Sequence, residues 1–253
     1  MGRIDPFGPG RAEAIVGLFR GVAAFFGGVG WVVTTPRIWP RAIVPVTTAL
    51  ALIAALGVLG VRGATTLTHR ALGDGLGAGF VGVLLALAAL VLALVVGVAF
   101  AQPLSGWALD GIVHVQEHDL GIAPASRPPF LTTMLGSLGS ALLGLALGVP
   151  LIVLLTLAGW LFPPAAVVTI PLKVVIAGLL LAWDLLDYPL ASRGLGVGAR
   201  LRWCAGHLGA ITGFGLAALL LFAVPGIGLL ALPCGVAGAV RLVASGRPGQ
   251  DRR

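Results

Sequence analysis

The stretch from Phe80 to Ala101 reads FVGVLLALAALVLALVVGVAFA and contains no polar side chain. A helix rises 1.5 Å per residue, so this stretch would reach about 33 Å. The hydrocarbon core of a bilayer is about 30 Å thick and takes about 20 apolar residues to cross. The uncharged stretch from Ala42 to Val61 meets the same criterion. Segments 42–61 and 80–101 are therefore predicted to be transmembrane helices.

The composition of the whole chain indicates a membrane protein. Of its 253 residues, 58% are hydrophobic and 10% are charged, whereas soluble proteins carry about 25% charged residues. Since this leaves too little polar surface to cover a soluble globule, we predict an all-α integral membrane protein with a single membrane domain over residues 1–253. The net charge of +7 comes from basic residues in loops beside apolar segments, which argues against a nucleic-acid partner.

Two later apolar blocks are predicted to form helical hairpins. Residues 131–162 are uncharged and would reach about 48 Å as one helix, so we expect breaks at Pro150 and at the Pro163-Pro164 pair. The chain would return to give a hairpin over 131–187. The last block turns at 224–228, and its arms of about 22 and 18 Å are too short to cross the bilayer. We therefore expect a re-entrant hairpin over 208–243.

The first apolar segment, 14–33, is interrupted by Arg20 and five glycines. This pattern predicts a helix that lies in the interface or packs against the bundle, and not a span. If each hairpin returns to the side it left, thirteen basic residues lie on one side of the membrane, and Arg62 and Arg70 lie on the other. Because basic residues gather on the cytoplasmic side, both termini are predicted to be cytoplasmic.

Several motifs make the sequence similar to the CysZ sulfate-permease and etoposide-induced-protein family. The most specific is Leu186-Asp187-Tyr188-Pro189, which precedes the glycine-rich hairpin of Gly213 to Val243. The stretch Phe100 to Leu104 is a further match and leads into an interfacial helix at 103–118. Together with the order of the spans, the resemblance covers roughly residues 16–243.

The resemblance implies a bacterial inner-membrane protein that passes sulfate inward for cysteine synthesis. It also implies two long transmembrane helices, two re-entrant (hemi-penetrating) hairpins and an oligomer, with no cofactor. Small residues at four-residue spacing, the pattern of helix-packing faces, support a homo-oligomer. They include Gly136, Ser140 and Gly144.

The resemblance places an anion-binding turn just before the first span, at Pro36 to Pro45. The anion-binding candidates there are Arg37, Ile38 and Arg41. A helix N-terminus offers free N–H groups, and arginine pairs bidentately with oxyanions. Here Arg37 stands where the family has glycine, and the paired arginines of the family turn are absent. The alternative is that both arginines anchor the first span at an anionic lipid surface.

Asp184, Asp187 and Tyr188 form a second candidate group, for gating or ion pairing. Asp184 and Asp187 are three residues apart and share a helix face. Ionisable groups close to a membrane are commonly functional or paired. The two aspartates could gate, carry protons, pair with an arginine or cap a turn before Tyr188-Pro189. The candidate partners are Arg193, Arg200 and Arg202.

Asp110, His114 and His118 lie four residues apart, on one face of a helix. This spacing suits a metal site or a proton relay. The simpler interpretation is the polar face of an interfacial helix, because a structural zinc site uses four ligands and no cysteine is near. We therefore predict no metal.

Two functions follow from the sequence. The first is a permease or channel for a small inorganic anion, with sulfate favoured by the resemblance. The chain has no glycine-rich nucleotide-binding loop, so such transport would be passive or ion-coupled. The second is a membrane scaffold that transports nothing. An enzyme is not expected, since no nucleophile with its base is recognisable. The expected partners are membrane lipids, the anion and further copies of the chain.

Overall fold

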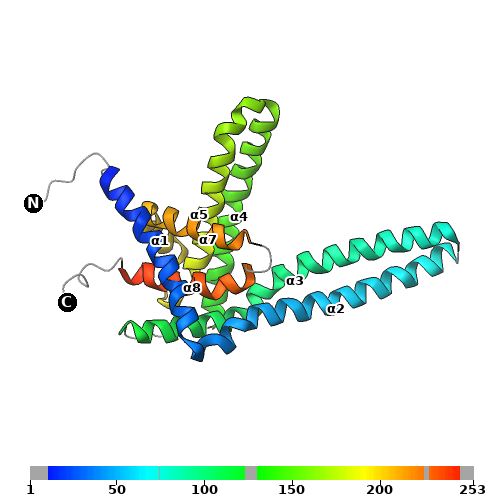
Figure 1. Ribbon diagram of the computed structural model, residues 1–253, viewed down its shortest axis with the longest axis horizontal. Coiled ribbons are helices and arrows are strands. Elements are labelled where there is room, and N and C mark those ends of the chain that lie inside the picture. Colours follow the sequence, from blue (N-terminus) through cyan, green and yellow to red (C-terminus); the bar gives the residue numbers. More distant parts are fainter. Residues whose placement is uncertain (1–10, 74, 123–129, 225–227, 246–253) are drawn as a thin grey trace, which may run out of the picture. The chain divides into compact units, whose positions relative to one another are not determined.

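A computed structural model describes residues 11–73, 75–122, 130–224 and 228–245, and every regular element in these ranges is a helix (Figure 1). The all-helical prediction is confirmed. The elements are α1 (Arg11–Thr34), η1 (Pro36–Ile38), α2 (Trp39–Leu72), α3 (Leu76–Asp119), α4 (Phe130–Leu161), η2 (Pro163–Ala165), α5 (Ala166–Ser192), α6 (Val197–Gly206), α7 (Leu208–Phe222) and α8 (Gly228–Ser245).

Five helical segments in the described ranges are long and apolar enough to cross a membrane. Helices α6 and α7 would add a sixth if they formed one span, but they meet at a bend of 95°. Large apolar side chains stay exposed along these segments, as expected for surfaces that contact lipid. The chain is therefore a multi-pass membrane protein. The five segments are Ile15–Thr34, Pro36–Ala71, Gly77–Gly97, Leu142–Leu161 and Pro163–Ser192.

The chain forms two compact units, residues 1–39 with 109–253, and residues 40–108. The second unit is an antiparallel helical hairpin, in which Gly57 and Gly60 of α2 lie against Leu90 and Ala89 of α3. The segments expected as separate helices at 80–101 and 103–118 form one continuous helix, α3. Its last part, from Leu109, belongs to the first unit.

In the first unit, α1 packs along α7 and α8, while α5 packs on α4, α7 and α8. The hairpin expected at 131–187 corresponds to α4 and α5, which run side by side and are joined by η2 at Pro163-Pro164 (Figure 1). The break expected at Pro150 is wrong, because this proline lies inside α4. Membrane helices tolerate an internal proline, since neighbouring groups and small backbone adjustments satisfy the freed carbonyl.

Glycines bring α1 and α7 into backbone contact. A Cβ atom on Gly21 would lie 2.6 Å from the backbone nitrogen of Phe214, and a Cβ atom on Gly213 would lie 2.9 Å from Cα of Leu18. Beside these contacts the rings of Phe25 and Phe214, both completely buried, meet edge to face with centroids 5.7 Å apart. This crossing forms the centre of the first unit.

Candidate anion site

Arg37 follows the end of α1, within η1, and its guanidinium contacts the carboxylate of Asp119, the last residue of α3. Its Nη2 donates to both carboxylate oxygens, with 2.5 Å to Oδ2. The indole Nε1 of Trp31 in α1 donates to the same Oδ2 over 3.1 Å. A cation and a neutral donor thus converge on one carboxylate.

The Arg37 and Asp119 side chains remain accessible, with exposed fractions of 60% and 26%. The hydrogen bond from Arg37 holds the pKa of the Asp119 carboxyl below its ordinary value, and the bond from Trp31 acts in the same direction. Asp119 is therefore an anion at neutral pH. His118 Nδ1 lies 3.9 Å from the same carboxylate and would strengthen this effect when protonated.

The backbone N–H groups of the turn between α1 and α2 are largely bonded already. The N–H of Ile38 donates to the Thr35 carbonyl over 3.2 Å, and that of Trp39 donates to the Pro36 carbonyl. Pro40 has no N–H group. A bound anion would consequently depend on side chains more than on a helix N-terminus.

The three anion-binding candidates have different surroundings. Arg37 is accessible and holds Asp119. Ile38 is completely buried, so its side chain anchors η1 and cannot contact an anion. Arg41 is exposed at the start of α2 and belongs to the second unit.

A buried ion pair forms two residues before the end of α3, at Glu117. Arg193, which follows α5, donates its Nε to Oε1 of Glu117 over 3.3 Å, and the two side chains are 13% and 3% exposed. Nδ1 of His114 lies 4.0 Å from the other oxygen of Glu117. The neighbouring Gln116 is completely buried, and neither polar atom of its amide group has a hydrogen-bond partner among the residues that the structure describes.

The Leu-Asp-Tyr-Pro motif lies at the end of α5 and contains a second buried ion pair. Asp187 pairs with Nη1 of Arg200 in α6, and their side chains are 14% and 4% exposed. Nε of Arg200 also donates to the Leu195 carbonyl over 2.7 Å. The structure therefore selects Arg200 among the three candidate partners, and this pair ties α6 to α5.

The other members of the second candidate group lie beside this pair. Asp184 is exposed on the same face of α5 as Asp187. The phenol of Tyr188 is partly buried, within electrostatic range of the carboxylates of Asp110, Asp184 and Asp187. This end of α5 thus gathers several carboxylates around one phenol.

A comparison with protein families matches residues 24–233 to the model described as sulfate transporter CysZ/etoposide-induced protein 2.4. The chain belongs to this family. The matched range contains Arg37, Asp119 and the Leu-Asp-Tyr-Pro motif, so the resemblance expected from that motif is confirmed. A search of curated proteins finds no match. The CysZ description concerns membrane transport and not an enzymatic reaction.

The remaining candidates of this CysZ-family chain form no metal centre in the described ranges, where no group of three His, Cys, Asp or Glu side chains could hold an ion. His114 faces Glu117, while the side chain of His118 is 90% exposed. Cys204 and Cys234 are both buried as free thiols.

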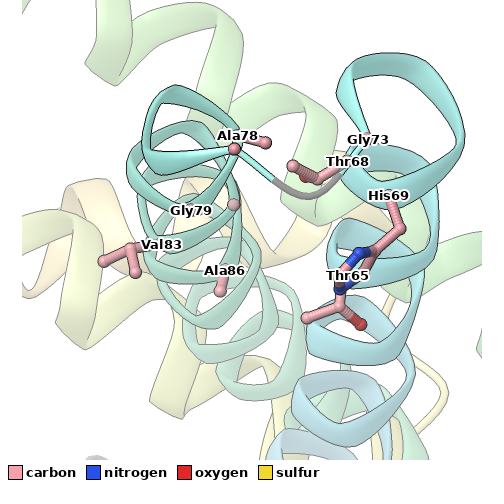
Figure 2. Close-up of a pocket in the computed structure, with 10 residues that line it drawn as sticks. Thr65, Thr68, His69, Gly73, Ala78, Gly79, Val83 and Ala86 are labelled. Atoms are coloured by element: carbon pink, nitrogen blue, oxygen red, sulfur yellow. The ribbon is translucent and has the colours of Figure 1, made fainter.

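A cavity of about 400 Å³ lies within the second unit, between the end of α2 and the start of α3 (Figure 2). The hydroxyls of Thr65 and Thr68 face it, but each donates to a carbonyl of its own helix, over 2.9 and 2.8 Å. Among the described lining residues there is no arginine or lysine. The described lining of the cavity therefore lacks the guanidinium on which the Arg37 site of this CysZ-family protein depends.

The sequence alone does not predict that Asp119 pairs with Arg37, or Glu117 with Arg193. The partners are separated by 82 and 76 residues. The available signal was charge complementarity between the acidic end of α3 and arginines that flank other apolar helices. Charge complementarity predicts that the partner is an arginine but does not identify which arginine.

Proposed function

We propose that this CysZ-family protein is a permease or channel for a small oxyanion, with sulfate as the first candidate, in the bacterial inner membrane. The observation that carries the proposal is the Arg37 site. Its guanidinium, together with the Trp31 indole, already holds an anionic group with two oxygens at an accessible position. Sulfate presents oxygens of the same kind, and arginine recognises such groups bidentately.

The arrangement that we propose in the membrane has two long spans, α2 and α3, and re-entrant hairpins, with both termini in the cytoplasm. Helix α7 has 15 residues and α8 has 18, so they reach about 22 and 27 Å, less than the hydrocarbon thickness. Residues 231–240 of α8 are all buried. This burial fits a re-entrant hairpin, because a hairpin that turns at membrane depth must be shielded from lipid by surrounding protein.

Cysteine labelling tests this topology in a background that carries Cys204→Ala and Cys234→Ala. A Val224→Cys protein should resist a membrane-impermeant maleimide added from outside. Gly75→Cys, at the turn between α2 and α3, is the matched control and should react, because that turn is predicted to lie outside. Reaction at both positions would mean that α7 and α8 are full spans.

Uptake of radiolabelled sulfate into proteoliposomes tests the function itself. We expect saturable uptake that unlabelled sulfite inhibits. Combined Arg37→Ala and Arg41→Ala substitutions should abolish it without affecting insertion. Arg70→Ala, which removes an exposed arginine at the other end of α2, should retain uptake. Loss of uptake in both proteins would point to a general charge effect.

A scaffold without transport is the second candidate function. The observation that favours it is that Asp119 already occupies Arg37, in a turn that lacks the family's glycine and arginine pair. Absence of sulfate uptake above an inactive membrane-protein control, from folded protein, would make the scaffold the better conclusion.

A further inference from the structure

We propose that Asp119 is a tethered competitor for the anion site, so that an oxyanion reaches Arg37 by displacing the Asp119 carboxylate. This inference rests on the proposed function and names a residue that sets the apparent affinity of the site for anions. The carboxylate takes the same donors, Nη2 of Arg37 and Nε1 of Trp31, that a bound oxyanion would take. Both occupants cannot use these donors at once.

The exposure of the pair makes displacement feasible. Arg37 and Asp119 are 60% and 26% exposed, and exposed ion pairs are weak because water and salt screen them. The two other arginine–carboxylate pairs described above are at most 14% exposed. Opening a buried pair would strand a charge in a poorly solvated environment. Arg37–Asp119 is thus suited to exchange, whereas the buried pairs are suited to hold helices together.

The backbone at Asp119 is fixed, so the exchange requires only a side-chain rotation. The N–H of Gly121 donates to the His118 carbonyl, and the N–H of Ile122 donates to the Glu117 carbonyl over 2.9 Å. Gly121 has a φ of 66°, the left-handed conformation that closes a helix C-terminus. Ile122 is 6% exposed and anchors this cap. Helix α3 can therefore stay in place while the carboxylate leaves Arg37.

Selectivity among anions comes from Arg37 itself, because displacing the Asp119 carboxylate costs every anion the same free energy. Replacing one negative charge by another of equal size gains little Coulomb energy, whereas a doubly charged anion interacts about twice as strongly with Arg37. Oxygens placed to match the guanidinium fork further separate oxyanions from chloride. When protonated, His118 would favour whichever anion occupies the site.

The test is the KM of sulfate uptake by proteoliposomes that contain Asp119→Asn protein. We expect KM to fall about fivefold, the upper end for an exposed ion pair, and the preference for sulfate over nitrate to stay unchanged. Asp119→Glu keeps the competing charge and should stay close to wild type. Glu13→Gln removes the same charge near the start of α1, about 30 Å along that helix from its end, and should leave KM unchanged. An unchanged or raised KM in Asp119→Asn would overturn the proposal.

Sulfate binding at equilibrium separates this inference from the proposed function. The ¹⁵N signal of the Trp31 indole, assigned with Trp31→Phe, should shift at lower sulfate concentration in Asp119→Asn than in wild type. If this occurs without uptake in either protein, the competition stands and the permease function fails. If wild type transports sulfate but both KM and the titration are unchanged in Asp119→Asn, the permease stands and the competition is refuted. If neither protein transports sulfate or shows a shift, both proposals fail.

Discussion

The Asp187–Arg200 pair tests whether the Leu-Asp-Tyr-Pro motif has a structural role. Asp187→Ala would leave the Arg200 guanidinium, whose side chain is 4% exposed, without its carboxylate. Removing one partner of a buried ion pair costs about 3–5 kcal/mol. Because Nε of Arg200 keeps its bond to the Leu195 carbonyl, we expect the lower end, about 3 kcal/mol. Arg200→Ala loses that bond as well and should cost at least as much.

Replacing both partners together measures how much the interaction between Asp187 and Arg200 contributes to stability. Asp187→Leu with Arg200→Met removes both charges and keeps apolar volume, so its stability should lie within about 1 kcal/mol of wild type or above it. The matching single variants, Asp187→Leu and Arg200→Met, would sum to about 6 kcal/mol of destabilisation, so their cycle with the double variant should show coupling well above 2 kcal/mol. Arg202→Met, an exposed neighbour on α6, should change stability by less than about 0.5 kcal/mol.

Equilibrium unfolding in mixed detergent micelles, followed by tryptophan fluorescence, measures these differences. Trp203 stacks on His207 at the end of α6, with ring centroids 4.5 Å apart, and so reports on this helix. The structural role would be refuted if the single variants had additive effects on the unfolding free energy, or if Asp187→Ala lowered it by less than about 1 kcal/mol. The motif would then be a better candidate for gating, which sulfate uptake by the folded variants would test.

Three further predictions concern other contacts. Gly213→Val should prevent folding of the first unit, since the valine side chain would overlap the α1 backbone. Gly206→Ala should fold normally, because there is open space around Gly206. Equal yields of monodisperse protein from the two variants would contradict this prediction. Trp183→Phe removes a 3.0 Å hydrogen bond to a carbonyl of α4 and should lower the unfolding free energy by about 1 kcal/mol. The same equilibrium unfolding measurement checks this, and no change would mean that the hydrogen bond does not contribute to stability. Asp119 has a lowered folded pKa, so its ion pair contributes stability above the unfolded value of 3.8 and loses it as pH falls through the folded value. The ¹³C signal of its carboxyl carbon should titrate below pH 3.8, and a midpoint at or above 3.8 would exclude a lasting pair with Arg37.

The apolar helices were predictable because membrane insertion depends on local composition. Phe80 to Ala101 needs no partner to be recognised as a membrane helix, and two adjacent prolines at 163 and 164 mark a turn in any context. Pro150 misled the prediction, since a single proline ends a helix in water more readily than among packed membrane helices. The glycines of α1 counted in the sequence against a transmembrane span, whereas in the structure Gly21 allows contact with α7.

The charged sites were predictable to different degrees. Arg200 was among the partners expected for Asp187 because only 13 residues separate them. Arg37 was a candidate from its place before the first span, but its partner Asp119 could not be chosen, since pairing over 82 residues depends on how helices pack. Periodicity fixes the face on which a residue lies and leaves open which helix covers that face.

The contact of α1 with α7 and α8 has a consequence for biosynthesis. The first helix leaves the ribosome about 200 residues before its last packing partner, and translation at 5–20 residues per second makes this delay roughly 10–40 s. During that time α1 must wait in or on the bilayer with its glycine face uncovered. A nascent chain arrested before α7 would therefore present α1 as a transient client for membrane chaperones or proteases.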